Sequence, residues 1–454
     1  MYDVIVIGSG PGGYVAAIRL AKLGKSVAVI EKAQTGGTCT NVGCIPTKAM
    51  LTASHLYTDI QKKAARFGIT VTECEYNLAG IMKHMGKVVA ASRKGIQFLF
   101  KKNGIDYYEG TAVVQDRETV KIEETGKELQ GRNLVLAHGS TPVVFPPFSD
   151  VEGIWTSDDV FRMDAIPKEL VIVGGGVVGV EFSTFFAALG TKVHLVELLD
   201  HILPTEDPDV AKVIRKSLTR QGVDIKEGHK VSAVAKTAEG YVCTIDGKDG
   251  SQHEVTADCV LLVVGRRPVI PDDVKQLGIQ IGRGVVTNDA MQTSIENIYA
   301  VGDIRAQIML AHVAMAEGIV AAHTIAGQSK HMEYSATPWV IFSSPEIAAT
   351  GLREREADPE KVEVAKFPLM ANGRARTMQE RDGFVKILAD KATHAVLGMT
   401  IVSPNATDMI MEGVLAVRYG LTVDQLVEAI HPHPTLTETV LGALEVAEGM
   451  PIHL

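Results

Sequence analysis

Two cysteines near the N-terminus have the spacing of a pair that can exchange electrons. Cys39 and Cys44 are separated by four residues, one of which is Gly43. Such a pair can close into a small disulfide loop, and the thiolate of a cysteine that opens a helix is a nucleophile with a lowered pKa. The spacing alone is compatible with a redox dithiol, a metal site or a structural disulfide.

The cysteine pair follows a glycine-rich fingerprint for dinucleotide binding. In this motif one glycine allows the tight turn, a second lets the backbone approach a pyrophosphate, and a third lets helix and strand pack closely. The N-terminus of the helix attracts phosphate, and an acid after the second strand accepts hydrogen bonds from the ribose. The parts here are the strand Val4 to Ile7, Gly8, Gly10, Gly13, the helix to Leu23, and Glu31.

The fingerprint returns without a gap further along the chain, where its parts are Gly174, Gly176, Gly179 and Glu197. Two dinucleotide sites on one chain predict two cofactors that meet, FAD and a nicotinamide dinucleotide. Because the first copy continues into the cysteine loop, we expect the dithiol to belong with the first cofactor. Glu197 and Asp200, with no arginine beside them, would repel a 2′-phosphate, which favours NAD over NADP.

Composition narrows the classes of function. The 454 residues are enough for two to four domains, and the net charge of −9, from 45 basic and 54 acidic residues, argues against a nucleic-acid surface. No apolar run approaches the roughly 20 residues of a membrane span, and the first residues enter a strand at once, so we expect neither a membrane segment nor a signal peptide. Five cysteines are not a secreted disulfide framework. We therefore predict a cytoplasmic protein.

The patterns predict an α/β fold with two Rossmann-like dinucleotide-binding domains and an α+β C-terminal domain. Short antiparallel strands are expected within 104–137. The other expected helices are 54–67, 78–100, 208–221, 310–326, 405–418 and 436–448, and the other expected strands are 260–264, 298–301, 339–342, 383–388 and 394–401.

Motifs along the whole chain resemble those of the pyridine nucleotide-disulfide oxidoreductases, the disulfide reductases with two dinucleotide-binding domains. The cysteine segment is one of them. The others are Gly265-Arg266-Arg267-Pro268, Tyr299 to Asp303, Leu310-Ala311-His312 with Glu317-Gly318, Asp382 to Lys386, and His431 to Glu438. The resemblance implies a homodimer and four domains, which are an FAD-binding domain 1–143, an NAD-binding domain 144–267, a central domain 268–335 that completes the FAD site, and an interface domain 336–454.

Within this family the motifs are most similar to those of the members that oxidise dihydrolipoamide with NAD. The resemblance implies that Cys39 exchanges with the substrate and that Cys44 faces the flavin. His433 would be the acid–base residue, oriented by Glu438 and contributed by the second subunit, although the residues alone leave His431 as a rival. The implied partners are lipoyl domains of 2-oxo acid dehydrogenase complexes or the H protein of glycine cleavage.

The resemblance also implies the residues that bind the cofactors. Asp303 would bind the ribityl chain of FAD, and Lys48 would pair with Glu181 beside the flavin and the nicotinamide. The full set is Gly8, Gly10, Gly13, Glu31, Thr38, Lys48, Gly139, Asp303, Ala311, His312, Gly174, Gly176, Gly179, Glu181, Glu197 and Gly265. No metal is implied.

Two alternatives stay open. One is a sibling NAD(P)H-dependent disulfide reductase, although the C-terminus carries no extra cysteine pair and no arginine stands directly after the second strand of the second fingerprint. The other is a zinc module built from Cys39, Cys44, His431 and His433, whose spacings are unusual for such a site. The chain also departs from the family pattern at His138, where a threonine is usual.

Overall fold

The computed structural model describes all 454 residues, which fold into two compact units. The first unit contains residues 1–145, 155–165 and 264–333, and the second contains residues 146–154, 166–263 and 334–454. The predicted FAD-binding and central segments fall mostly in the first unit, and the predicted NAD-binding and interface segments fall mostly in the second. None of the helices combines the length and apolar character that a membrane crossing requires.

The first unit is built on a seven-stranded sheet with the order β3-β2-β1-β6-β5-β4 and with β17 beside β6. Its parallel strands β1, β2, β3, β6 and β17 end at a common edge, where loops of such sheets bind ligands. The bounds are β1 (Tyr2–Ile7), β2 (Val27–Glu31), β3 (Asp106–Glu109), β4 (Ala112–Val114), β5 (Thr119–Ile122), β6 (Glu128–Leu136) and β17 (Ile298–Ala300). The expectation of antiparallel strands is therefore correct for β4 and β5 but wrong for β3, which pairs in parallel with β2.

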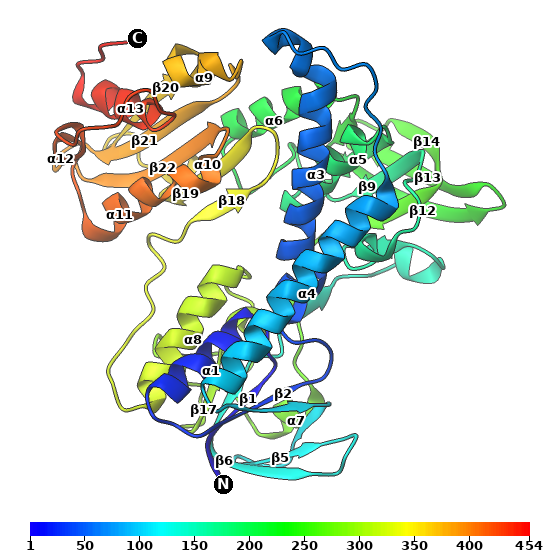
Figure 1. Ribbon diagram of the computed structural model, residues 1–454, viewed down its shortest axis with the longest axis vertical. Helices are drawn as coiled ribbons and strands as arrows, with labels where there is room; N and C mark the ends of the chain where they lie inside the picture. The colour runs from blue at the N-terminus through cyan, green and yellow to red at the C-terminus, as the bar shows by residue number, and fades with distance from the viewer. The chain divides into compact units, whose positions relative to one another are not determined.

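Helices cover this sheet, and α1 and α8 lie side by side over it (Figure 1). The helices of the first unit are α1 (Pro11–Lys22), α2 (Gly37–Val42), α3 (Cys44–Lys62), α4 (Leu78–Lys102), α7 (Asp272–Gln276) and α8 (Ala311–Ile325). Single 3-10 turns span Ala64–Phe67, Val160–Arg162 and Gly302–Arg305, and the short strands are β7 (Ser140–Pro142), β8 (Trp155–Thr156) and β16 (Arg266–Pro268).

One helix begins earlier than the sequence pattern predicts. The expected helix 54–67 is α3, which starts at Cys44 and ends at Lys62. Its first turn contains Pro46, a residue that is tolerated there because the first N–H groups of a helix have no intrahelical acceptor. The consequence is that Cys44 itself opens the helix.

The second unit contains a parallel sheet in which β11, β10, β9 and β15 are neighbours, and a three-stranded antiparallel sheet β12-β13-β14. The strands are β9 (Glu169–Val173), β10 (Lys192–Glu197), β11 (Asp224–Glu227), β12 (His229–Thr237), β13 (Gly240–Gly247), β14 (Gln252–Ala257) and β15 (Cys259–Leu262). The helices of this part are α5 (Val177–Ala188), α6 (Pro208–Arg220) and the 3-10 turn Phe148–Asp150.

The repeated fingerprint is repeated in the structure as well. Helix α5 occupies the same place in the second copy as α1 does in the first, since Pro11–Lys22 becomes Val177–Ala188. The strand register corresponds equally, because Val4 lies opposite Val27 in the first unit and Leu170 lies opposite Val193 in the second. The two copies thus share both their local structure and their pairing.

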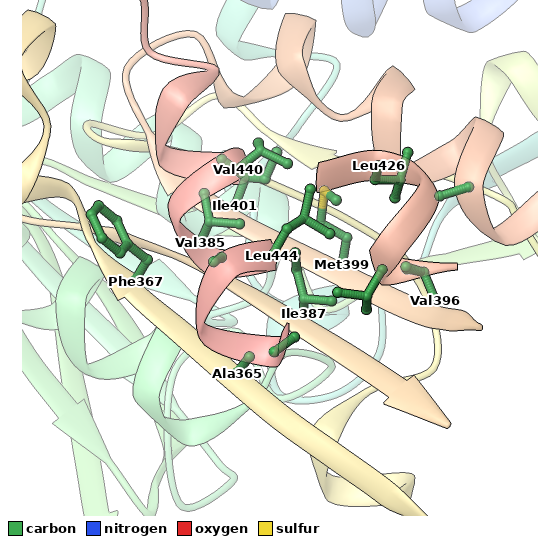
Figure 2. Packing of buried hydrophobic residues seen from close by; sticks show 14 of the residues in the cluster. Ala365, Phe367, Val385, Ile387, Val396, Met399, Ile401, Leu426, Val440 and Leu444 are labelled. Atoms are coloured by element: carbon green, nitrogen blue, oxygen red, sulfur yellow. The ribbon is translucent and has the colours of Figure 1, made fainter. Parts of the chain in front are cut away.

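The C-terminal part of the second unit is a five-stranded antiparallel sheet with the order β18-β19-β22-β21-β20. Val440 and Leu444 of α13 pack on this sheet among apolar residues of its strands (Figure 2). The strands are β18 (Trp339–Ile341), β19 (Glu346–Gly351), β20 (Val362–Pro368), β21 (Phe384–Asp390) and β22 (Val396–Ser403). The helices are α9 (Gly373–Thr377), α10 (Ala406–Met409), α11 (Met411–Tyr419), α12 (Val423–Val427) and α13 (Glu438–Glu448), with 3-10 turns at Glu354–Glu356 and Leu369–Ala371.

Candidate active site

The two cysteines form a disulfide at the junction of two helices. Cys39 lies in α2, Cys44 is the first residue of α3, and their Cα atoms are 4.6 Å apart. The junction needs a glycine, because a Cβ on Gly43 would lie 3.0 Å from the Thr38 carbonyl oxygen and 3.2 Å from the Cα of Cys39. Both cysteines are half-buried, so the bond is accessible without being fully exposed. The predicted disulfide is present.

The start of α3 favours a thiolate at Cys44. The free N–H groups of a helix N-terminus carry partial positive charge, which stabilises an anion there. Helix α3 has no acidic residue in its first turn to oppose this effect, and the Thr47 hydroxyl donates to the Gly43 carbonyl at 2.6 Å, which closes the turn. Once reduced, Cys44 is therefore the cysteine whose negative charge the backbone supports.

The first fingerprint has the geometry of a pyrophosphate cradle. Gly8 has a φ of +97°, and a Cβ on Gly13 would lie 2.0 Å from the Gly8 carbonyl oxygen, so the turn and the close packing both require glycine. At Gly10, in contrast, an added Cβ meets no protein atom within 4 Å, which leaves room for a ligand at the N-terminus of α1. The residues present fit a dinucleotide.

The acid of each fingerprint is held by backbone N–H groups. One carboxylate oxygen of Glu31 accepts from the Ser9 N–H at 2.8 Å, and the other accepts from the Ala33 N–H at 2.9 Å. Glu197 is held in the same way by the Gly175 N–H at 2.6 Å and the Leu199 N–H at 2.8 Å. Both carboxylates are thus fixed where the motif places the ribose hydroxyl groups.

The second fingerprint also fits a dinucleotide, with one neighbour that the sequence pattern does not reveal. A Cβ on Gly179 would lie 1.9 Å from the Gly174 carbonyl oxygen, whereas Gly176 again faces open space. The Nζ atom of Lys248 lies 2.6 Å from Asp200, the second acid of the predicted NAD site. This lysine follows β13, well outside the fingerprint, so only the fold brings its charge to the site.

Asp303 lies in a network of the first unit. Its carboxylate accepts from the Ser140 hydroxyl at 2.5 Å, and Arg266 donates to that hydroxyl at 2.8 Å and to the Ser140 carbonyl at 2.9 Å. The remaining predicted cofactor residues of this unit lie in the first two turns of helices or beside strands: Thr38 in α2, Lys48 in α3, Gly139 after β6, Gly265 before β16, and Ala311 and His312 in the first turn of α8.

The second unit brings His433 and Glu438 together. The Nδ1 atom of His433 lies 2.8 Å from a Glu438 oxygen, and the imidazole is 77% exposed. Burial alone would raise the pKa of Glu438, but the Thr435 N–H and the imidazole outweigh it, so this pKa lies below its usual value. With Nδ1–H directed at a carboxylate, Nε2 is the nitrogen that can accept a proton.

His431, the rival base, has a different environment. Its two ring nitrogens lie 3.0 Å from the Ala429 carbonyl oxygen and 3.1 Å from a Glu412 oxygen, and its side chain is only 7% exposed. The bond to Glu412 raises the pKa of His431 against the opposing effect of burial. Because two acceptors face the ring, both nitrogens serve as donors and neither is available as a base.

His138 is a buried imidazole in an unusual position. Neither ring nitrogen has a hydrogen-bond partner, and both are covered by protein. Burial lowers the pKa of His138 to about 4, so the ring is neutral at physiological pH. The nitrogens are too well covered to reach a ligand, and the departure from the family pattern therefore changes packing rather than adding a cofactor contact.

Family models decide which group of proteins this arrangement belongs to. A model of the pyridine nucleotide-disulphide oxidoreductases matches residues 2–318, and a model of the dimerisation domain of these enzymes matches residues 337–444. The chain belongs to this family. Membership confirms the predicted fold class, the flavoprotein disulfide oxidoreductase activity and the cofactors FAD and NAD.

Relatives named as dihydrolipoyl dehydrogenases match the whole chain. A dihydrolipoyl dehydrogenase of Geobacillus stearothermophilus is 38% identical over 100% of this chain and 97% of its own length, and one of Haloferax volcanii is 39% identical over 99% and 97%. These names agree with the activity predicted from the sequence. The match to the dimerisation domain supports the predicted homodimer, and the family assignment replaces the alternative of a zinc module.

Solved structures share the fold at lower identity. LpdA of Mycobacterium tuberculosis has a TM-score of 0.90 and 28% identity, covering 98% of this chain and 99% of its own. RclA of Escherichia coli, a flavoprotein disulfide reductase induced by HOCl, has a TM-score of 0.87 and 25% identity, covering 98% and 100%. The fold of this chain is therefore shared along nearly its whole length with both structures.

Proposed function

We propose that this chain oxidises protein-bound dihydrolipoamide to lipoamide and passes the electrons through FAD to NAD⁺. The observation that carries the proposal is the Cys39–Cys44 disulfide at the N-terminus of α3, directly after the first fingerprint. The dihydrolipoyl dehydrogenases among the relatives supply the substrate class. FAD, when bound, would accept the electron pair of the reduced dithiol and deliver it as hydride to NAD⁺.

The thiol chemistry follows from the chain's own residues. His433 takes the proton of one substrate thiol, and the resulting thiolate attacks Sγ of Cys39. The S–S bond to Cys44 breaks, Cys44 leaves as a thiolate at the start of α3, and a mixed disulfide forms at Cys39. The second substrate thiol attacks the substrate sulfur of that mixed disulfide and its proton passes to the departing Cys39 sulfur, which releases lipoamide and a Cys39 thiol.

The roles of single residues in this scheme are proposals. Glu438 orients His433 and stabilises its charged form, and a second copy of the chain supplies this pair to the disulfide. Asp303 holds the ribityl chain, and Lys48 and Glu181 pair beside the flavin. The cofactor contacts and the four domains are those implied by the resemblance, and the paired glycine and glutamate geometry of both fingerprints supports them.

The partner and the location are also proposals. We expect the lipoyl group to arrive on a lipoyl domain of a 2-oxo acid dehydrogenase complex or on the H protein of glycine cleavage. A cytoplasmic location is proposed for this chain, although a relative from Pisum sativum is named as mitochondrial.

The test is anaerobic reduction of the holoenzyme by dihydrolipoamide or by reduced glutathione, with NADH formation followed at each. We expect NADH with dihydrolipoamide alone, and loss of this activity in Cys39→Ser while the flavin spectrum persists. NADH formation with glutathione and none with dihydrolipoamide would identify a sibling reductase. Full dihydrolipoamide activity in Cys39→Ser would show the mechanism to be wrong.

A further inference from the structure

Glu317 is a buried acid beneath the turn that carries Asp303. It belongs to α8 and is 1% exposed. One carboxylate oxygen accepts a hydrogen bond from the Gly302 N–H at 2.6 Å, and the other pairs with the guanidinium of Arg305. A single side chain therefore holds both ends of the turn Gly302–Arg305.

Arg305 completes this arrangement. Its side chain is 3% exposed, and besides pairing with Glu317 it donates to the Thr287 hydroxyl at 3.0 Å and to the Gln307 side chain at 2.9 Å. A guanidinium so deeply buried needs a carboxylate partner, because an isolated buried charge is strongly disfavoured. Glu317 thus fixes the turn and also neutralises the residue that ends it.

The helix that carries Glu317 is itself fixed against the first fingerprint. A Cβ on Gly318 would lie 2.4 Å from the Gly12 carbonyl oxygen, so α8 contacts the backbone of α1 at this point (Figure 1). Gly302, with a φ of +75°, has Ala314 of the same helix 3.1 Å from the position of a Cβ. The turn, α8 and the glycine-rich start of α1 are therefore packed directly against one another.

The Asp303 carboxylate is held independently on its other side. Ser140 donates to it at 2.5 Å and is held in turn by Arg266. The side chain is thus oriented by Ser140 while its backbone is placed by Glu317. An acid fixed at both its backbone and its carboxylate is preorganised for a ligand.

We propose that Glu317 is a positioning residue for FAD, which it acts on through Asp303. This inference rests on the proposed function, in which Asp303 binds the ribityl chain. Glu317 touches no ligand itself. It sets the position of the Asp303 backbone relative to the fingerprint, so that the pyrophosphate and the ribityl chain are met by groups at a fixed separation.

The test measures FAD release from the holoenzyme by the rise in free-flavin fluorescence, together with the melting temperature. We expect Glu317→Ala to release FAD about tenfold faster, because removing a residue that orients a ligand-binding side chain weakens binding by about this factor. Asp303→Asn should have a similar effect, and Asp303→Asn with Glu317→Ala should add little to it, because both act through one group. Glu317→Gln with Arg305→Gln, which keeps an acceptor for Gly302 and leaves no unpaired charge, should restore most of the retention.

A matched control is the buried ion pair between Arg353 and Glu206 in the second unit, with an N–O distance of 3.4 Å. Glu206→Gln should lower the melting temperature without changing FAD release. Unchanged FAD release in Glu317→Ala, equal acceleration in Glu206→Gln, or additive effects of Asp303→Asn and Glu317→Ala would each overturn the proposal. If Asp303→Asn retains FAD normally, the positioning role is wrong, whereas reduction by dihydrolipoamide still tests the proposed function separately.

Discussion

Replacing Lys386 with alanine should destabilise the second unit more than any exposed lysine replacement. Lys386 lies in β21 with its side chain fully buried, and its ammonium group donates to Asp207 at 3.0 Å, Asp209 at 2.8 Å and Glu354 at 2.5 Å. Burial disfavours the charged form, but hydrogen bonds to the three acids outweigh it and raise the pKa of Lys386. The lysine thus stays charged and joins β21 to the start of α6.

The magnitude follows from what the substitution leaves behind. Breaking a buried ion pair by removing one partner costs about 3–5 kcal/mol. Asp207 is 2% exposed, but Asp209 and Glu354 are 32% and 47% exposed, so water relieves part of their repulsion and the lower end applies. A loss of about 3 kcal/mol, at about 2–4 °C per kcal/mol for a unit of this size, lowers the melting temperature by about 6–12 °C.

A cation should rescue the variant. The three acids place carboxylate oxygens within 4.8 Å of one another, and removal of the ammonium group opens a site of hard oxygen ligands. If calcium binds with a dissociation constant of about 1 mM, about 10 mM calcium restores about 1.4 kcal/mol. Wild-type protein, whose ammonium occupies that position, should not respond.

The assay is thermal unfolding of the holoenzyme with and without calcium, with Lys366→Ala as the control. Lys366 also lies 2.8 Å from Asp209, but its side chain is 42% exposed, so its loss should cost at most about 1 kcal/mol. Equal melting temperatures for the two variants would refute the burial argument. Equal stabilisation of wild type and Lys386→Ala by calcium would refute the assignment of the cation to these acids.

Three further substitutions test the titrations and the specificity of the site. His138→Thr should stabilise the protein relative to wild type increasingly as pH falls. The folded pKa of about 4 lies below the unfolded value, so wild type loses about 2 kcal/mol relative to the variant between pH 7 and pH 5. A difference in melting temperature between the two proteins that does not change with pH would contradict this. His431→Asn should destabilise the protein below pH 6.5 and progressively less as pH rises through the raised folded pKa. The reason is that only the protonated ring can donate to both the Ala429 carbonyl and Glu412, and a constant difference in urea midpoint would exclude this. Glu197→Ala should raise the KM for NADH about tenfold with less effect on NADPH, and an unchanged ratio of the two KM values would count against its role at the ribose.

Local patterns predict the two nucleotide-binding motifs well. The glycines, the helix start and the terminal acid of each copy lie within one strand–helix–strand segment, and the structure repeats α1 as α5 with the same strand register. Each position has a local cause, because Gly13 and Gly179 would both place a Cβ against a carbonyl oxygen of their own turn. The same holds for the disulfide, whose junction is fixed by Gly43.

Elements that depend on distant partners are predicted less well. The sequence pattern does not predict strands β19 and β20, and the expected helix 405–418 is divided into α10 and α11. Strand β20 exposes several of its residues in a charged stretch, and its partner β21 supplies the pairing that makes it a strand. The sequence of a single segment does not reveal which strand it will pair with. It does not reveal the direction of pairing either, as β3 shows by pairing in parallel with β2.

The burial of charged residues is the feature that local sequence patterns predict least well. By composition Lys386, Glu317 and Arg305 would each be assigned to solvent, yet all three are at most 5% exposed. Each has its partner on a different element, and the partner of Lys386 at the start of α6 is so distant in the sequence that no local window contains both. Such charges are tolerated only where several hydrogen bonds converge, and convergence of that kind fixes the segments that meet there.

In this chain the buried charges join α8 to the Asp303 turn and α6 to the C-terminal sheet. They therefore mark where separate segments of the chain are held against each other. A junction of this kind gives a loop the rigidity that ligand binding needs, because the position of the loop is then set by the fold rather than by its own sequence. The Asp303 turn is the one of these two junctions at which a cofactor is proposed to bind, so the loss of Glu317 should be detected in FAD retention as well as in stability.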